Sequence, residues 1–332
     1  MASLLSRLSA SFKLTRSIKN IVKLPLETPI EEETLPHYNP AHYYPVQIGD
    51  VYYSMYKISG KLGYGAYSTS RLCQDFQGNG YNVLKVSTSL PDHPTASDRE
   101  LRVYEHLSKV KSMHPGQSLI RELYDSFDLQ GPGGTHRCLV LQPMNFTLLE
   151  MMGMNSKPFG LPLLKMTIRR LLLALVFLHT EAGVVHTDLK PDNLMLSLED
   201  HGMLTNFAAA EIEDPSPRKV VDSSRTIYLS RKFRRPTGSK NIGLPILCDF
   251  REARIGKTQE SGPFIQPHIY RAPEVIFEMP WGSAIDIWNL AGLIWDLFEG
   301  EHLFDGISNS KGRHDPFKHL PRMVALIGPP PV

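Results

Sequence analysis

Residues 184–193 constrain this chain more than any other part of its sequence. The run Val-Val-His-Thr-Asp-Leu-Lys-Pro-Asp-Asn contains an acid, Asp188, a cation two residues later, Lys190, and an amide, Asn193. The β-branched pair before it and the apolar residues 194–196 after it are typical of short strands, so we expect one polar loop between two strand-like pieces. A polar turn after a buried helix is the simpler alternative. It would explain any one of these residues alone, but it does not explain the spacing of all three.

These three residue types match what phosphoryl transfer from ATP requires. A carboxylate accepts the proton of the attacking hydroxyl, a cation steadies the moving phosphoryl group, and an amide carbonyl oxygen holds a magnesium ion. We therefore expect Asp188 and Lys190 to be catalytic and Asn193 to be a metal ligand. The cofactors that this assignment implies are ATP and Mg²⁺.

The loop resembles the catalytic loop of eukaryotic protein kinases, and its His-Thr-Asp in place of His-Arg-Asp resembles the SR-protein kinase branch. The resemblance implies an α+β, two-lobed fold with a small β-rich N-lobe and a larger helical C-lobe. It also implies ATP-dependent transfer of the γ-phosphoryl group to serine or threonine of protein substrates, with Arg/Ser-rich segments as the expected targets. Lys190, two residues after Asp188, points to serine/threonine rather than tyrosine transfer.

A glycine-containing segment with strand-like alternation precedes this loop. Gly63 and Gly65 would let the backbone bend over phosphates and offer its N–H groups, although hairpins use Gly-x-Gly constantly. Ser68 stands where most kinases have a third glycine, as in the SR-protein kinases, and Ser70 replaces the usual valine over the adenine. By the resemblance, the residues expected to contact the nucleotide here are Leu62, Gly63, Tyr64, Gly65, Ala66, Tyr67, Ser68, Thr69 and Ser70.

Two charged residues are expected beside the nucleotide phosphates. Lys85 lies between apolar neighbours in an expected strand, and it matches the lysine that holds the α- and β-phosphates in the family. A solvent-facing lysine on an edge strand is the alternative. Glu100 sits beside the apolar stripe of a helix predicted over residues 96–111, which suits the carboxylate that orients Lys85.

An apolar strand ending at a proline, residues 138–143, resembles the hinge between the kinase lobes. In that resemblance Leu141 is the gatekeeper residue. The backbones of Gln142 and Met144 would then form hydrogen bonds with adenine. The long helix that leads into the catalytic loop is expected over residues 163–179.

A second acid, Asp249, follows a buried strand-like run and fits the Asp-Phe-Gly position, where the family's carboxylate binds magnesium. Arg251 replaces the glycine, whose backbone freedom serves switching. We expect arginine to restrict that motion and to crowd the site. A catalytically weak or inactive pseudokinase, acting as a nucleotide- and protein-binding module, is therefore the alternative function. A small-molecule phosphotransferase is disfavoured, because the Ala-Pro-Glu run at Glu274 resembles the family's peptide platform.

The order of the motifs sets the expected organisation of the chain. We expect a basic tail and linker over residues 1–50, with residues 27–50 either a linker or an extended segment laid over the first lobe. The N-lobe and hinge would span 51–144, and a partial C-lobe 145–332.

The end of the chain and one insertion depart from the family pattern. The chain stops before several family helices, including one with an arginine partner for Glu274, so we expect a truncated C-lobe with an unpaired buried carboxylate. The insertion at 197–243 lies where SR-protein kinases carry a spacer. We expect it to be a solvated, poorly ordered loop rather than a partner-binding site.

Composition bounds the partners and the compartment. With 42% apolar and 21% charged residues the chain can build a sizeable core, and a net charge of +2 implies no global attraction to nucleic acid or membrane. The apolar run 171–178 is too short to span a bilayer, and the widely spaced Cys73, Cys138 and Cys248 suggest a reducing compartment. We expect a monomer, without direct nucleic-acid binding, in the cytoplasm and/or nucleus. Mitochondrial localisation is the alternative if the acid-free, basic residues 1–26 are a transit peptide.

Overall fold

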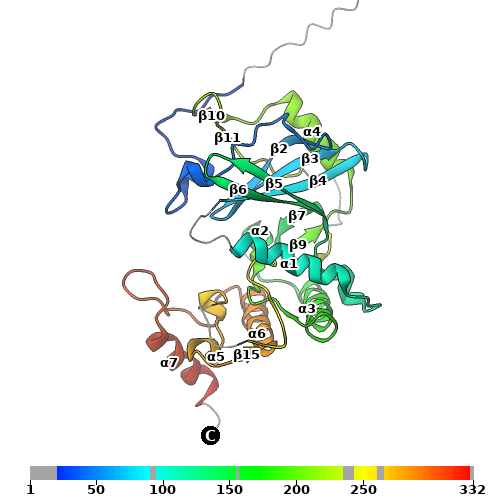
Figure 1. The fold of residues 1–332 in the computed structure, drawn as a ribbon. Coiled ribbons are helices and arrows are strands. Elements are labelled where there is room, and N and C mark those ends of the chain that lie inside the picture. Colours follow the sequence, from blue (N-terminus) through cyan, green and yellow to red (C-terminus); the bar gives the residue numbers. More distant parts are fainter. Residues whose placement is uncertain (1–20, 90–94, 155–156, 235–242, 260–264, 330–332) are drawn as a thin grey trace, which may run out of the picture.

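The computed structural model describes residues 21–89, 95–154, 157–234, 243–259 and 265–329, and it has two lobes (Figure 1). The upper lobe is an antiparallel six-stranded sheet in the order β1-β2-β3-β4-β6-β5, and the lower lobe is mainly helical. This arrangement confirms the expected α+β, two-lobed architecture. The segment 1–20, which carries most of the expected transit peptide, lies outside the described residues.

The elements up to the end of the long C-lobe helix are β1 (Val51–Tyr52), β2 (Tyr56–Gly65), β3 (Ser68–Asp75), β4 (Gly80–Ser87), α1 (Thr95–Lys109), β5 (Leu123–Gly131), β6 (Gly134–Leu141), β7 (Met144–Thr147), α2 (Leu148–Met154) and α3 (Leu161–Val176). The elements after it are β8 (Val184–Val185), β9 (Leu194–Ser197), α4 (Gly202–Glu213), β10 (Arg218–Val220), β11 (Thr226–Tyr228), β12 (Pro245–Leu247), β13 (Arg254–Ile255), β14 (Thr258–Gln259), α5 (Pro273–Ile276), β15 (Trp281–Gly282), α6 (Ala284–Glu299) and α7 (Pro316–Ile327).

The glycine-containing segment forms the β2–β3 hairpin of the N-lobe sheet. Gly65 pairs with Ser68, so the hairpin turns at residues 66 and 67. The register shifts twice along β2, and the second shift lies between Lys61 and Gly63. Such irregularities bend a strand and increase its twist. The bend lies at the start of the segment that the sequence assigns to the nucleotide.

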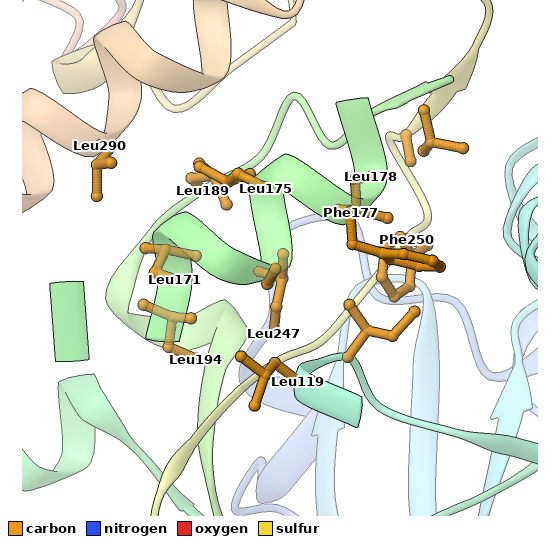
Figure 2. Close-up of a cluster of buried hydrophobic side chains, with 14 of the residues drawn as sticks. Leu119, Leu171, Leu175, Phe177, Leu178, Leu189, Leu194, Leu247, Phe250 and Leu290 are labelled. Atoms are coloured by element: carbon orange, nitrogen blue, oxygen red, sulfur yellow. The ribbon is translucent and has the colours of Figure 1, made fainter. Parts of the chain in front are cut away.

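The C-lobe core joins the segments that carry the polar loop and Asp249 (Figure 2). After α3 the chain makes a π-helical turn, Phe177–Ala182, which ends at Gly183 in a left-handed conformation, φ +62°. Buried side chains from α3, this turn, the polar loop, β9, β12 and α6 form one cluster. Its labelled members are Leu119, Leu171, Leu175, Phe177, Leu178, Leu189, Leu194, Leu247, Phe250 and Leu290. Burial of each such side chain contributes about 1.5–3 kcal/mol, so the core fixes both segments relative to each other.

The insertion is folded over residues 202–234, so its expected character as a solvated, poorly ordered loop is wrong there. Helix α4 packs against β2, and Leu204 and Phe207 form a buried cluster with Leu72 of β3. Gly60 leaves room for the Phe207 ring, because a Cβ at this glycine would lie 2.7 Å from it. The physical reason for the correction is that α4 has an apolar face and buries it on the N-lobe. Residues 235–242 lie outside the described part of the chain.

The segment that precedes β1 lies over the N-lobe and joins the insertion, which matches the second of the two alternatives for residues 27–50. Its backbone pairs with Arg218, whose N–H donates to Val22 O at 3.0 Å and whose C=O accepts from Leu24 N at 2.9 Å. The fully buried Lys61 of β2 forms ion pairs with Glu32 and, at 3.2 Å, with Glu31. The N-lobe therefore depends on a charge contact with the segment that precedes it.

The structure also bears on the expectations for the cysteines, for a membrane-spanning helix and for Glu274. Cys73, Cys138 and Cys248 are buried free thiols, and burial raises the pKa of Cys73 to about 12, which makes it unreactive. In the ranges that the structure describes, no helix is long and apolar enough to cross a membrane. Glu274 is partly exposed, so the expected cost of an unpaired buried carboxylate does not arise there, since solvent reaches the side chain.

Replacement of Glu32 by alanine should destabilise the protein. Lys61 would keep only the longer contact with Glu31, and a buried ammonium group without a full counter-charge is costly. Because Glu31 remains, we expect a loss of about 2 kcal/mol in the free energy of unfolding, measured by urea denaturation. The exposed Glu27→Ala is the matched control and should change the free energy by less than about 0.5 kcal/mol. Equal stability of the two variants would contradict the role given to the buried pair.

Candidate active site

A cavity of about 530 Å³ is lined by residues of both lobes. This volume is within the range of sites for small molecules and cofactors. Its N-lobe wall comes from β2, β3, β4 and α1, and its C-lobe wall comes from β7, α2, β9 and the segment after β12. The expected site residues that line it are Leu62, Gly63, Tyr64, Gly65, Ser68, Ser70, Lys85, Glu100, Met144, Asn193 and Asp249.

Other expected nucleotide contacts lie outside this lining. Ala66 and Tyr67 form the hairpin tip, and Thr69 is buried on β3 between the lining residues Ser68 and Ser70, as strand alternation requires. Gln142 also lies outside. Its N–H donates to Glu122 O at 3.0 Å and its C=O accepts from Arg121 Nε at 2.9 Å. Adenine contact by Gln142 stays a prediction.

Lys85 connects two carboxylates inside the cavity. Its Nζ is 2.7 Å from Glu100 Oε2 and 3.3 Å from Asp249 Oδ1, which brings β4, α1 and the segment after β12 together. The Glu100 side chain is only 2% exposed. Burial alone would raise the pKa of Asp249, but Lys85 and Arg251 outweigh it and hold the pKa of that carboxyl well below its usual range. Asp249 is therefore ionised at neutral pH.

The polar loop places Asp188 next to Asn193 and Lys190. Asn193 Nδ2 donates to the Asp188 carboxylate at 2.8 Å and to its backbone oxygen at 2.7 Å. Lys190 Nζ is 2.9 Å from Asp188 Oδ2. Asp188 and Lys190 lie outside the cavity lining, and Asn193 links them to it. The arrangement is a carboxylate held by two donors beside a cavity that a nucleotide could fill.

The backbone of this loop is held from two sides. Asp286 of α6, which is fully buried, accepts the N–H groups of His186 and Thr187, each at 2.8 Å. Thr187 has a left-handed backbone, φ +67°, and its hydroxyl donates to Glu252 O at 2.7 Å. Two charge-assisted bonds from one carboxylate compensate for this strained conformation.

Hydrogen bonds also tie the loop to the strand that precedes Asp249. The Cys248 N–H donates to Asn193 O at 2.8 Å, and His186 Nε2 contacts Cys248 O at 3.1 Å. The segments that carry Asp188 and Asp249 are thus adjacent although the insertion separates them in sequence. Both acids border the same site.

The donor set fits a divalent metal. Asn193 directs its amide nitrogen to Asp188, which leaves Oδ1 as the ligand atom, and Asp249 supplies an ionised carboxylate. Oxygen ligands of this kind suit Mg²⁺. Among the described residues there is no group of three or more His, Cys, Asp or Glu that could hold a metal. Two protein ligands would therefore bind the metal together with nucleotide phosphates.

Three residues of the insertion, Arg231, Lys232 and Phe233, also line the cavity and were not expected there. The Arg231 N–H donates to Lys61 O at 2.9 Å, Phe233 packs in the cluster of Leu72 and Leu62, and Lys232 Nζ is 2.5 Å from Glu150 of α2. These residues therefore contact both lobes at the cavity. In the sequence this segment is a basic tract, residues 231–235. The aromatic residue Phe233 within the tract was the one sequence feature that indicated packing.

The family model of the protein kinase domain matches residues 56–236. A serine/threonine protein kinase of Aspergillus fumigatus (strain Af293) is 44% identical over 305 residues, which covers 91% of this chain and 72% of that protein. Serine/threonine-protein kinase SRPK of Physarum polycephalum is 30% identical over 316 residues, covering 90% and 72%. Protein kinase dsk1 of Schizosaccharomyces pombe is 24% identical over 385 residues, covering 89% and 70%.

Replacement of Asp286 by asparagine should loosen the polar loop. One of the two backbone N–H groups would lose its carboxylate oxygen acceptor, so we expect a loss of about 2–4 kcal/mol in unfolding free energy. Hydrogen exchange of the amides of His186 and Thr187 should become faster under native conditions. Asp296→Asn is the matched control, because Asp296 is also buried but bonds to Tyr270 and His302. Protection of both loop amides in Asp286→Asn at the wild-type level would contradict this assignment.

Proposed function

This chain belongs to the protein kinase family, and from that membership we propose that Asp188, Lys190, Lys85, Glu100, Asn193 and Asp249 form its catalytic centre. The protein is an ATP-dependent serine/threonine protein kinase, which uses ATP and a divalent metal. The observation that carries the proposed centre is the contact of Lys85 with both Glu100 and Asp249, in the cavity that Asn193 also lines.

The proposed roles are those that the kinase family implies, and the contacts of these side chains support them. The substrate hydroxyl oxygen attacks the γ-phosphorus, and Asp188 accepts the proton of that hydroxyl. The bond between the γ-phosphorus and the oxygen that bridges it to the β-phosphate breaks, which releases ADP. Lys190, which is 2.9 Å from Asp188, would stabilise charge on the transferred group. Lys85, oriented by Glu100, binds the α- and β-phosphates. Mg²⁺, the metal we propose, would neutralise phosphate charge, and Asn193 and Asp249 would hold it.

A catalytically inactive pseudokinase is not favoured over this function. Every charged side chain that the mechanism needs is present, and the Lys85–Glu100 ion pair is formed at 2.7 Å. Thr187 stands in place of the arginine that many kinases use to sense a phosphorylated activation segment. Its hydroxyl bonds directly to the backbone of Glu252 in that segment. We propose that this kinase requires no such phosphorylation, and the neutral contact of Thr187 supports this.

We propose Arg/Ser-rich proteins as the substrates. Similarity to SRPK of Physarum polycephalum supports this substrate class. We further propose a monomer that acts in the cytoplasm and/or nucleus, a compartment that suits three buried free thiols. The mitochondrial alternative depends on the N-terminal residues outside the described part of the chain.

Replacement of Asp188 by asparagine should abolish most of the transfer. Loss of the proton acceptor should lower kcat by about 10²–10⁴-fold, while ATP affinity stays within about threefold because the phosphate ligands remain. The measurement is transfer of radiolabelled phosphate from ATP to an Arg/Ser repeat peptide, with ATP affinity determined by calorimetry. Asp305→Asn, an exposed acid paired with Arg322 on the C-lobe, is the control and should keep wild-type activity. Undiminished transfer by Asp188→Asn would reject the assignment of the base.

The same assay tests the substrate class. A peptide with lysine in place of each arginine keeps the charge but loses the planar, forked donors of the guanidinium group. We expect at least about tenfold lower kcat/KM for the lysine peptide. Equal rates for both peptides would remove the support for Arg/Ser-rich recognition while leaving the kinase activity intact.

A further inference from the structure

Arg251 places a guanidinium group in the cavity at a position where the family motif has a glycine. The residue lines the cavity, and its side chain is 20% exposed. Its Nη2 is 3.3 Å from Asp249 Oδ2. The guanidinium carbon also lies 4.6 Å from the centroid of the Tyr67 ring, at the tip of the β2–β3 hairpin. The arginine thus connects the metal-ligand candidate Asp249 with the glycine-containing hairpin.

One donor of this guanidinium group has no partner. Arg251 Nε is buried and forms no hydrogen bond with any residue that the structure describes. A buried donor without a partner is rare in proteins, and when it belongs to a residue that lines a cavity, an acceptor on a bound ligand is one partner that would satisfy it. Because Arg has no acceptor atoms and stays charged, that ligand group should be anionic.

The charges at this end of the cavity favour the same conclusion. Among the charged side chains that line the cavity, four are acidic, Glu100, Glu150, Asp192 and Asp249, and four are basic, Lys85, Arg121, Arg231 and Lys232. Arg251 is the fifth basic side chain and brings the formal sum of these groups from 0 to +1. A polyphosphate entering the site would therefore meet less repulsion from the carboxylates before any metal ion contributes. Guanidinium groups also match phosphate oxygens with two parallel donors.

We propose that Arg251 is a phosphate-binding residue that lets this kinase hold ATP without a divalent metal. Its Nε and Nη groups donate to oxygens of the β- and γ-phosphates, and the Tyr67 ring lies against the guanidinium group and keeps the hairpin over these phosphates. This inference rests on the proposed function insofar as the cavity is the ATP site. It assigns to Arg251 a positive role in binding, in contrast to the crowding that the sequence led us to expect.

The test measures ATP affinity by calorimetry on the full chain, once in EDTA and once in MgCl₂. Arg251→Gln keeps much of the side-chain length but removes the charge, and Arg251→Gly restores the family residue. We expect each to weaken metal-free ATP binding by at least about tenfold, the loss of one or more charge-assisted hydrogen bonds. In MgCl₂ the loss should be below about threefold, because the metal supplies the missing charge.

Two controls separate this effect from general damage. AMP affinity in EDTA should stay unchanged in both variants, because AMP lacks the β- and γ-phosphates. Arg322→Gln removes an arginine that pairs with Asp305 outside the cavity, and it should bind ATP like the wild type in both buffers. Thermal melting of each variant checks that it folds. If Arg251→Gly does not fold, the comparison of ATP affinities is made with Arg251→Gln alone.

The outcomes are distinct. Metal-free ATP binding that is equal in wild type and Arg251→Gln would overturn the proposal, as would tighter binding by the variant, which would make Arg251 a blocking residue. Undetectable metal-free binding by the wild type would overturn it as well. The result is independent of transfer: if Asp188→Asn leaves transfer unchanged, the proposed catalytic base fails, while Arg251-dependent binding of ATP would still stand.

Discussion

The contact of Lys85 with two carboxylates is the interaction on which the rest of the site depends. It joins β4 and helix α1, which follow each other in the sequence, to the segment after β12, where Asp249 lies 164 positions beyond Lys85. A charge with little solvent contact is costly unless it is paired, so each partner of this contact requires the placement of the others. The surrounding fold supplies that placement: α1 buries Glu100 against the N-lobe, and the C-lobe core holds Phe250, the residue after Asp249.

The catalytic loop is built on the same principle, with one buried acid as its centre. Asp286 accepts two backbone N–H groups, which lets Thr187 keep a left-handed conformation that would otherwise be costly. The bonds between Cys248, Asn193 and His186 then fix this loop beside Asp249. In this way the apolar core and a few charge-assisted hydrogen bonds together determine the positions of residues that a mobile loop could not hold.

The insertion and the segment before β1 extend the N-lobe beyond the kinase motifs. Together they surround the buried Lys61, and the insertion continues to the cavity at Arg231, Lys232 and Phe233. The cavity therefore has cationic groups at two places that its motif residues do not provide, the insertion and Arg251. These cations come from different parts of the chain, and within the insertion Arg231 is paired with Glu211 and Lys232 with Glu150.

The sequence by itself determined the two-lobed architecture and which motif residues could share a site, since the order and spacing of Lys85, Glu100, Asp188, Asn193 and Asp249 are visible in it. The tertiary structure decided how the insertion folds, that Gln142 lies outside the cavity lining, and where the Arg251 side chain points. Linear spacing reports local conformation and chemistry. It does not show which surface an amphipathic helix such as α4 will cover, or which charged groups a flexible side chain such as that of Arg251 will contact. Both depend on contacts between segments that are distant in sequence.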